Sequence, residues 1–280
     1  MKKRGKKFNK KRFWITISII LIIFVSWSII VRPSNNRNWS SDQKVLSYYE
    51  KEGDLIHVYN IRNFTYRSTT DYDINYYNKT FDLNNLDSVD YIVEPFSDWE
   101  GSAHTFVSFG FKDDEYLAIS IEIRKDVGET FSGFKGLFKQ YEIMYVLGDE
   151  KDLVKLRSNY RKDDVFIYPI NTTKEKIEMM LLGMLDRANK LKDQPEFYNT
   201  ITNTCTTNIV KHVRTISHGR VPRSLKVLAP GYSDRLAYDI GLINTNLSFK
   251  EIRAYYRINE RAEKYANDPE FSKKIREYGT

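Results

Sequence analysis

Apolar and polar positions alternate through much of the chain between residues 55 and 170. A period of two is typical of strands that bury one face of a sheet. The pattern predicts six strands, at Ile56–Tyr66, Tyr91–Phe96, His104–Phe111, Tyr116–Arg124, Glu142–Leu147 and Val165–Ile170. The polar run at residues 112–115 lies between two of these strands and predicts a hairpin. We therefore expect an antiparallel sheet in the middle of the chain.

After residue 171 the apolar positions change to a helical period. Thr172 and Glu175 have the spacing of a capping box. The apolar positions that follow predict a helix with one buried face, made of Ile177, Met180, Leu181, Met184, Leu185, Ala188 and Leu191. Its methionines are expected to fill the core rather than to bind a ligand. Further helices are predicted after Cys205, from Gly231 and Asp234 to about Ile240, after the capping box Ser248 and Glu251, and after Asp268-Pro269.

The amino terminus has a different pattern, because Phe13–Val31 is nineteen residues without a charge. At about 1.5 Å per residue, such a helix nearly spans a hydrocarbon core of roughly 30 Å. The basic run MKKRGKKFNKKR precedes it, so the positive-inside rule predicts a cytoplasmic tail and an extracytoplasmic body. A cleaved signal peptide is the alternative, but its apolar region is usually shorter and small residues follow it. We expect an uncleaved single-pass anchor in the cytoplasmic membrane.

The net charge of +7 is carried by this terminus. Residues 1–32 hold nine of the 44 Lys and Arg residues and no acidic residue, which leaves 35 basic against 37 acidic side chains in the body. A nucleic-acid-binding domain normally has a basic face of its own. No nucleic-acid partner is therefore expected. Neither zinc-ligand spacing nor a Gly-rich phosphate loop is present, and no cofactor or metal is predicted.

Cys205 is the one cysteine of the chain, so it has no partner for an intramolecular disulfide. A run of Thr and Asn residues leads into helical sequence at this point, which predicts the sulfur in the first turn of a helix. Free N–H groups and the helix dipole favour a thiolate there and can hold an oxyanion. A buried, inert cysteine on an amphipathic helix is the alternative.

A cysteine nucleophile needs a base within hydrogen-bonding distance, and the chain has His57, His104, His212 and His218. His212 lies seven residues further along the same predicted helix, about 10 Å in rise, and is too distant to touch the sulfur. His218 is expected in a loop, and His57 in an early strand without distinctive neighbours. His104 begins the hairpin after Gly101-Ser102-Ala103; by itself, a histidine in a strand is usually structural.

Five ordered segments closely resemble the bacterial Lnb N-terminal periplasmic domain family: residues 61–66, 104–109, 120–124, 135–142 and 195–207. The resemblance covers roughly residues 55–245. It implies an α+β domain with a permuted papain-like, NlpC-type fold, in which an antiparallel sheet packs against helices and a strand-borne His precedes a helix-borne Cys. On this resemblance the catalytic pair is Cys205 and His104.

The expected hairpin pairs Phe111 with Tyr116, and therefore His104 with Ile123. This register places Ser120, Glu122 and Arg124 on the sheet face opposite to His104, and a turn one residue longer or shorter reverses the faces. Glu122 is a candidate for the third group that orients the imidazole; the alternative is a solvated charge paired with Arg124. Candidate substrate-binding residues are Arg124, whose guanidinium suits a phosphate or a carboxylate, with Asn203 and Thr206.

The family is linked to acylation of bacterial lipoproteins, so the resemblance implies a membrane-anchored acyltransferase that works through an acyl-thioester. Its partners would be a phospholipid or lipoprotein acyl donor and a lipoprotein amino terminus as acceptor. A cell-wall cysteine peptidase or amidase and a non-catalytic envelope scaffold are the alternatives. The expected organisation is a cytoplasmic tail (1–12), a transmembrane anchor (13–31), a linker and entry segment (32–54), the extracytoplasmic (periplasmic) catalytic domain (55–245) and a helical extension (246–280).

Overall fold

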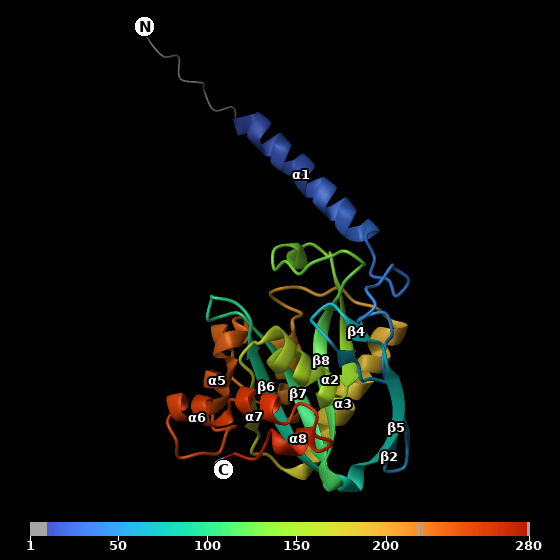
Figure 1. The fold of residues 1–280 in the computed structure, drawn as a ribbon. Coiled ribbons are helices and arrows are strands. Elements are labelled where there is room, and N and C mark those ends of the chain that lie inside the picture. Colours follow the sequence, from blue (N-terminus) through green and yellow to red (C-terminus); the bar gives the residue numbers. More distant parts are fainter. Residues whose placement is uncertain (1–9, 218, 220, 279–280) are drawn as a thin grey trace.

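A mixed β-sheet with helices on both faces forms the body of the protein in the computed structural model, which describes residues 10–217, 219 and 221–278 (Figure 1). The strands are β1 (Tyr48–Glu52), β2 (Leu55–Arg62), β3 (Thr65–Tyr66), β4 (Tyr72–Asp73), β5 (Tyr76–Asp82), β6 (Leu86–Pro95), β7 (Ala103–Phe111), β8 (Glu115–Arg124), β9 (Glu142–Gly148) and β10 (Phe166–Pro169). The α-helices are α1 (Lys10–Ile30), α2 (Glu150–Lys155), α3 (Lys174–Asp193), α4 (Cys205–Ile216), α5 (Ser233–Asp239), α6 (Phe249–Tyr256), α7 (Asn259–Lys264) and α8 (Phe271–Lys274). The predicted α+β class is confirmed.

The strand order in the main sheet is β1-β2-β9-β8-β7-β6-β10, with β5 paired to β2 outside this row. Most neighbouring strands are antiparallel, as the sequence predicts. The contact between β2 and β9 is parallel, through Arg62 and Gly148. The expectation of an antiparallel sheet is therefore wrong for this pair, because β9 pairs antiparallel with β8 on one side and on its other side lies beside β2, which runs in the same direction.

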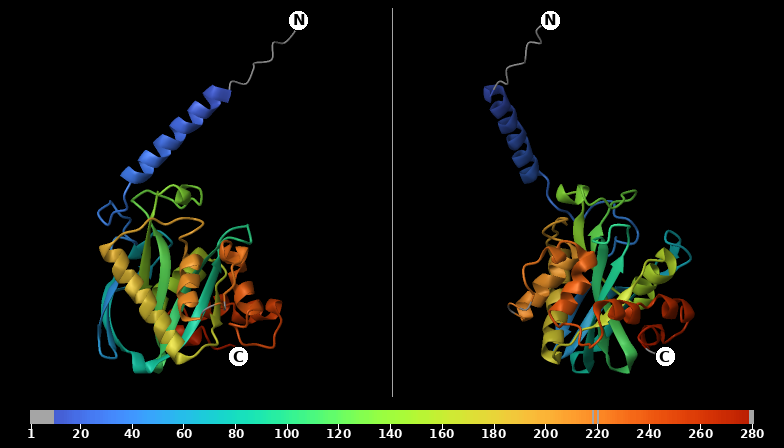
Figure 2. Two further views of the ribbon diagram at one scale, coloured as in Figure 1. Left: turned by 180° about the vertical axis from the view of Figure 1, so that it is seen from behind. Right: turned by 90° about the vertical axis from the view of Figure 1, so that its left-hand side faces the viewer.

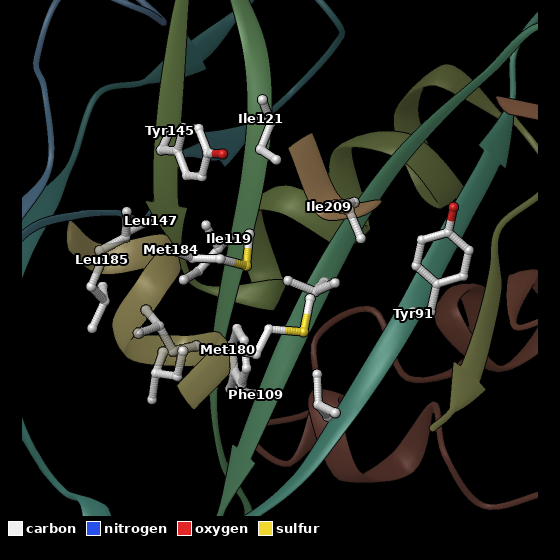
Figure 3. Close-up of a cluster of buried hydrophobic side chains, with 14 of the residues drawn as sticks. Tyr91, Phe109, Ile119, Ile121, Tyr145, Leu147, Met180, Met184, Leu185 and Ile209 are labelled. Atoms are coloured by element: carbon white, nitrogen blue, oxygen red, sulfur yellow. The ribbon is translucent and has the colours of Figure 1, made fainter. Parts of the chain in front are cut away.

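The long helix α3 covers one face of the sheet together with α4, and α2, α7 and α8 lie on the other face (Figure 2). All seven apolar residues predicted for its inner face are buried. Met180, Met184 and Leu185 point from α3 into a cluster that includes Phe109 and Ile119 of the sheet (Figure 3). Each such side chain contributes roughly 1.5–3 kcal/mol on full burial. The two methionines fill the core, as expected from the spacing.

The observed N-cap of α6 is the predicted one, and the observed N-cap of α3 differs from the predicted one by one residue. Ser248 and Glu251 form the predicted capping box at the start of α6. At α3 the N-cap is Thr173 rather than Thr172. Glu175 is therefore at the second helical position, where its carboxylate faces the N–H groups of the first turn. The predicted capping box of Thr172 and Glu175 is therefore wrong by one residue at its N-cap.

The hairpin of β7 and β8 has a shorter turn than the polar run suggests. Asp113 and Asp114 both have positive φ angles, 63° and 57°, which Asp tolerates better than most residues. The strands therefore turn within Lys112–Asp114, and Phe111 pairs with Glu115 instead of Tyr116. The predicted register is wrong by one residue, and this reverses the face assigned to every side chain of β8.

Segments at both ends of the body belong to its packing. Trp39, in the predicted linker, is buried, and Tyr48–Glu52 of the same segment forms the edge strand β1. In the predicted extension, Ile258 and Phe271 are fully buried against the sheet, and Arg276 bonds the buried carboxylate of Glu150. The body thus extends from the linker to the end of the described chain.

Helix α1 projects away from the body (Figures 1 and 2). None of its residues is buried, and by length and composition it is the one described helix able to cross a membrane. Its carboxyl end adjoins the loop between β8 and β9 (residues 125–141), where Lys139 Nζ donates to the Ser28 carbonyl at 2.6 Å. The basic tail before residue 10 lies outside the described residues.

Candidate active site

Cys205 is the first residue of α4, as the sequence predicts. Thr204 is the N-cap, and it forms a reciprocal capping box with Thr207, a second Thr in the place usually taken by Glu or Gln. These bonds fix the first turn of α4. Helix geometry leaves the N–H groups of Cys205 and Thr206 without acceptors inside the helix, so they face outward beside the sulfur.

A pair of buried threonines holds this helix end against β7. Thr105 and Thr206 share a hydrogen bond of 2.9 Å between their hydroxyl oxygens. Thr105 follows His104, and Thr206 follows Cys205. The bond therefore fixes the two neighbouring residues relative to each other, although a hundred residues of chain separate them.

The sheet opens at the position of the sulfur. The pairing of β7 with β8 ends at Phe106 and Ser120. Near the end of this pairing, the sulfur of Cys205 lies 3.8 Å from the Thr206 hydroxyl, and His104 and Thr105 are close enough to lower the pKa of the thiol. The structure thus brings the two predicted catalytic residues together at the end of the hairpin.

The shorter turn places Glu122 on the same face as His104. His104 Nε2 lies 2.7 Å from Ser120 Oγ and 3.2 Å from Glu122 Oε1. Ser120 Oγ in turn donates to Glu122 at 2.6 Å. The expectation that Ser120 and Glu122 lie on the opposite face is wrong, because the register differs by one residue. Nε2 of the ring therefore faces two oxygen atoms, and Nδ1 remains for an interaction with the sulfur.

Two more charged residues, Arg157 and Glu94, extend the chain of contacts from His104 and Glu122. Arg157 donates to Glu122 at 2.7 Å and to Glu94 at 2.6 Å, and its guanidinium lies 4.8 Å from the centre of the Phe106 ring. Arg157 and Glu94 are almost completely buried. The alternative pairing of Glu122 with Arg124 is also wrong, since Arg157 takes that place. We call His104, Glu122, Arg157 and Glu94 the cleft floor.

Cys205 and His104 each stabilise the charged form of the other, and this shifts the pKa values of both groups. Burial by itself raises the pKa of the thiol, but the hydrogen bond and charge of His104 outweigh it and lower that pKa to about 7. Burial by itself lowers the pKa of His104, but the Glu122 carboxylate and Cys205 raise it to about 9. The pKa of Glu122 lies well below its usual range despite burial, because of His104 and Arg157. Between pH 7 and 9 the pair therefore exists as thiolate and imidazolium.

Cys205 and His104 lie in a cleft of about 540 Å³. Three of the side chains that line it are aromatic and exposed, Phe96 and Trp99 between β6 and β7, and Phe131 between β8 and β9. The rings of Phe96 and Phe131 meet edge to face, 6.4 Å apart. We call these three residues the cleft mouth. The site therefore joins a charged floor to an apolar mouth.

The predicted substrate-binding residues use their polar atoms within the fold. Arg124 donates to Asn35 and to the carbonyls of Gln43 and Lys44, and so ties the linker to the sheet. Asn203 bonds Phe197 and Asn208 and orders the loop before α4. Thr206 bonds Thr105, as described above. These contacts give each residue a structural role, and a role in substrate binding stays a prediction.

Three other histidines were candidate bases. His212 bonds the Tyr145 hydroxyl at 3.0 Å, and burial lowers its pKa to about 4, so its ring is neutral. His57 contacts Thr80 on the far part of the sheet. His218 lies outside the described residues. Of the three histidines that the structure describes, His104 is the one beside the sulfur.

Sequence reasoning missed Arg157 and Glu94. Glu94 is the one charged residue of the predicted strand Tyr91–Phe96, where a buried carboxylate has to be paired, and this was an available signal. Arg157 lies in a π-helical turn (Leu156–Arg161), which gave no sequence signal but often occurs at functional sites. Among residues 10–217, 219 and 221–278, no group of three or more His, Cys, Asp and Glu is arranged to hold a metal ion.

A comparison with models of protein families finds a match over more than half of the chain. The model of the Lnb N-terminal periplasmic domain matches residues 72–231, which is 160 of the 280 residues and includes Cys205, His104 and the whole cleft floor. No curated protein and no solved structure matches the chain.

Proposed function

The chain belongs to the Lnb N-terminal periplasmic domain family, and on that basis we propose that it is a membrane-anchored cysteine acyltransferase of the lipoprotein N-acylation type. The family and the helix α1 fit a single-pass membrane protein with a periplasmic domain. The observation that carries the proposal is the thiol of Cys205 at a helix amino terminus, with its pKa lowered to about 7 by His104. The anchor would keep this thiol beside the lipids of the inner membrane.

In the first half-reaction, the Cys205 thiolate attacks the ester carbonyl of a phospholipid or lipoprotein glyceride. The N–H groups of Cys205 and Thr206 would stabilise the negative oxygen that forms. The imidazolium of His104 then donates its proton to the departing glyceryl oxygen, which leaves as an alcohol. The products are an acyl-thioester on Cys205 and a neutral imidazole.

In the second half-reaction, the α-amino group of a lipoprotein cysteine attacks the thioester. His104 takes a proton from the attacking nitrogen, and the sulfur leaves as a thiolate. The acyl group is now an amide of the acceptor, and the thiolate and imidazolium are restored. Glu122 supports both steps because its carboxylate stabilises the imidazolium and orients the ring.

The fold proposed for this chemistry is a permuted papain-like fold. Its support is the order of the two residues, with His104 on a strand and Cys205 at the tip of a later helix, packed across the open end of one hairpin. The carboxylate of Glu122 takes the place of the third group that a cysteine–histidine pair needs.

Mass spectrometry of lipoprotein amino termini tests the function. Cells that express the chain should carry N-acylated lipoproteins, and cells that express Cys205→Ala should carry only free amino termini. His57→Ala is the matched control for His104→Ala, since His57 is on the far part of the sheet. Unchanged amino termini with release of cell-wall fragments would instead show a peptidase or amidase. Full complementation by Cys205→Ala would show a scaffold.

A further inference from the structure

The loop between β8 and β9 exposes several large apolar side chains close together. Phe134 is 71% exposed and Phe131 48%, and Val127, Leu137 and Phe138 are also exposed. Apolar residues on protein surfaces are common singly, but a cluster in one loop marks an interaction site.

This loop is ordered by bonds that hold the rings outward. Tyr141 Oη donates to the Thr130 carbonyl at 2.7 Å, and Thr200 Oγ1 donates to the Gly133 carbonyl at 2.6 Å. Arg37 bonds Asp126 at the base of the loop. The aromatic side chains are thus exposed by a fixed backbone, and not because the loop lacks contacts with the body.

The loop also lies at the end of the membrane helix (Figures 1 and 2). Lys139 donates to the carbonyl and the hydroxyl of Ser28 and lies 5.8 Å from the Trp27 ring. Ser28 is two residues before the last residue of α1. When α1 spans a bilayer, its end is at the lipid–water interface, and the loop is there with it.

The cleft opens on the same side. Phe131 belongs to this loop and to the cleft mouth, and it meets Phe96 of the loop between β6 and β7. That second loop also exposes Trp99, a residue type that prefers the membrane interface. The loop carries three basic residues, Lys125, Lys135 and Lys139, against the acidic Asp126 and Glu129, which both lie near Arg37. Basic residues beside aromatic ones favour an anionic lipid surface.

We propose that the β8–β9 loop and Trp99 insert into the outer leaflet of the membrane that α1 crosses, so that the cleft mouth opens directly to lipid. The occupant of this apolar surface is the bilayer itself. A lipid could then enter the cleft sideways from the leaflet. The insertion does not depend on the chemistry proposed for Cys205.

The test uses the full chain in vesicles of phosphatidylethanolamine and phosphatidylglycerol. In a Cys205→Ala background, Phe134→Cys carries an environment-sensitive fluorophore, and lipids with a nitroxide near the acyl carbonyl serve as quenchers. Leu137→Cys is a second labelling site in case the first variant fails to fold. Met179→Cys is the matched control: Met179 is 52% exposed, and it lies about 18 Å along α3 from Leu191, whose carbonyl is bonded to Asn35 of the linker.

We expect lipid quenching at position 134 to exceed that at position 179 by at least about threefold, with the reverse order for aqueous iodide. Equal quenching by iodide at the two positions would overturn the proposal. Protection of position 134 from both quenchers would also overturn it, because a protein partner would then cover the loop. Neither outcome depends on acyl transfer, so failure here is distinct from failure of the proposed function.

Discussion

The cleft floor buries charged side chains, whereas the cleft mouth exposes apolar ones. In the floor, Arg157 and Glu94 are charged and buried, and each is paired. In the mouth, Phe131 and Trp99 are apolar and exposed. A buried charge is stable only with a partner inside the protein, whereas exposed aromatic rings are stable when something outside covers them. The floor is therefore complete in the isolated chain, and the mouth is completed by the membrane.

The largest effect should come from removing Cys205 or its neighbour in the cleft floor, His104. Cys205→Ala and His104→Ala are each expected to lower acyl transfer by at least about 10³-fold, and the double variant should be little worse, because the two residues act as a unit. The measurement is the rate of transfer from a labelled lipid to a peptide amine in proteoliposomes. His57→Ala should leave the rate unchanged, and additive losses would contradict a joint action.

The next effect concerns the stability of the floor. Arg157→Met leaves Glu94 and Glu122 without their shared guanidinium, and we expect a loss of about 3–5 kcal/mol in the free energy of unfolding. Urea titration in mild detergent measures it. Arg161→Met is the matched control, because this more exposed arginine contacts the same Glu94 at 3.3 Å and should contribute less than about 1 kcal/mol. Equal losses for the two variants would show that burial of the pair has no role.

The pH dependence tests the charge states of Cys205 and of His104 in the cleft floor. The pKa of Cys205 is lowered to about 7, so the thiolate is present above that pH and alkylation by iodoacetamide should fall as the pH drops through about 7. The pKa of His104 is raised to about 9, so the imidazolium is lost above that pH. Acyl transfer should therefore fall above about pH 9, where alkylation stays fast.

Glu122→Gln sharpens the same measurement. Without the carboxylate the imidazolium is less stable, and the alkylation midpoint of Cys205 should move to higher pH. Glu50→Gln, at the edge strand β1, is the control and should leave the midpoint in place. An unchanged midpoint in Glu122→Gln would remove Glu122 from the site.

The smallest effect is expected at the mouth. Phe134→Ser should change the free energy of unfolding by no more than about 0.5 kcal/mol, since the ring is exposed, and it should leave the alkylation rate of Cys205 in detergent unchanged. Thermal or urea unfolding and alkylation kinetics measure the two quantities. A large loss of stability would show that the ring packs within the protein, as the side chains of the cleft floor do.

Much of the fold follows from periodicity. The strands around His104 and the buried face of α3 were predictable because burial of one face leaves a pattern of period two or 3.6 in the sequence. The position of Cys205 at the start of α4 was predictable from the Thr and Asn residues that precede it. The register of the hairpin was not, because it depends on whether Asp113 and Asp114 adopt left-handed conformations, which the composition of a polar turn leaves open.

By itself the sequence determined the long apolar helix α1, the α+β class and the placement of Cys205 and His104 in their own elements, since each depends on residues close together in the chain. Only the tertiary structure decided that Glu122 shares a face with His104, that Arg157 joins Glu122 to Glu94, and that the exposed loop lies beside the end of α1. These are contacts between distant segments. They depend on strand register and on the pairing of buried charges, and a single residue in one turn is enough to change them.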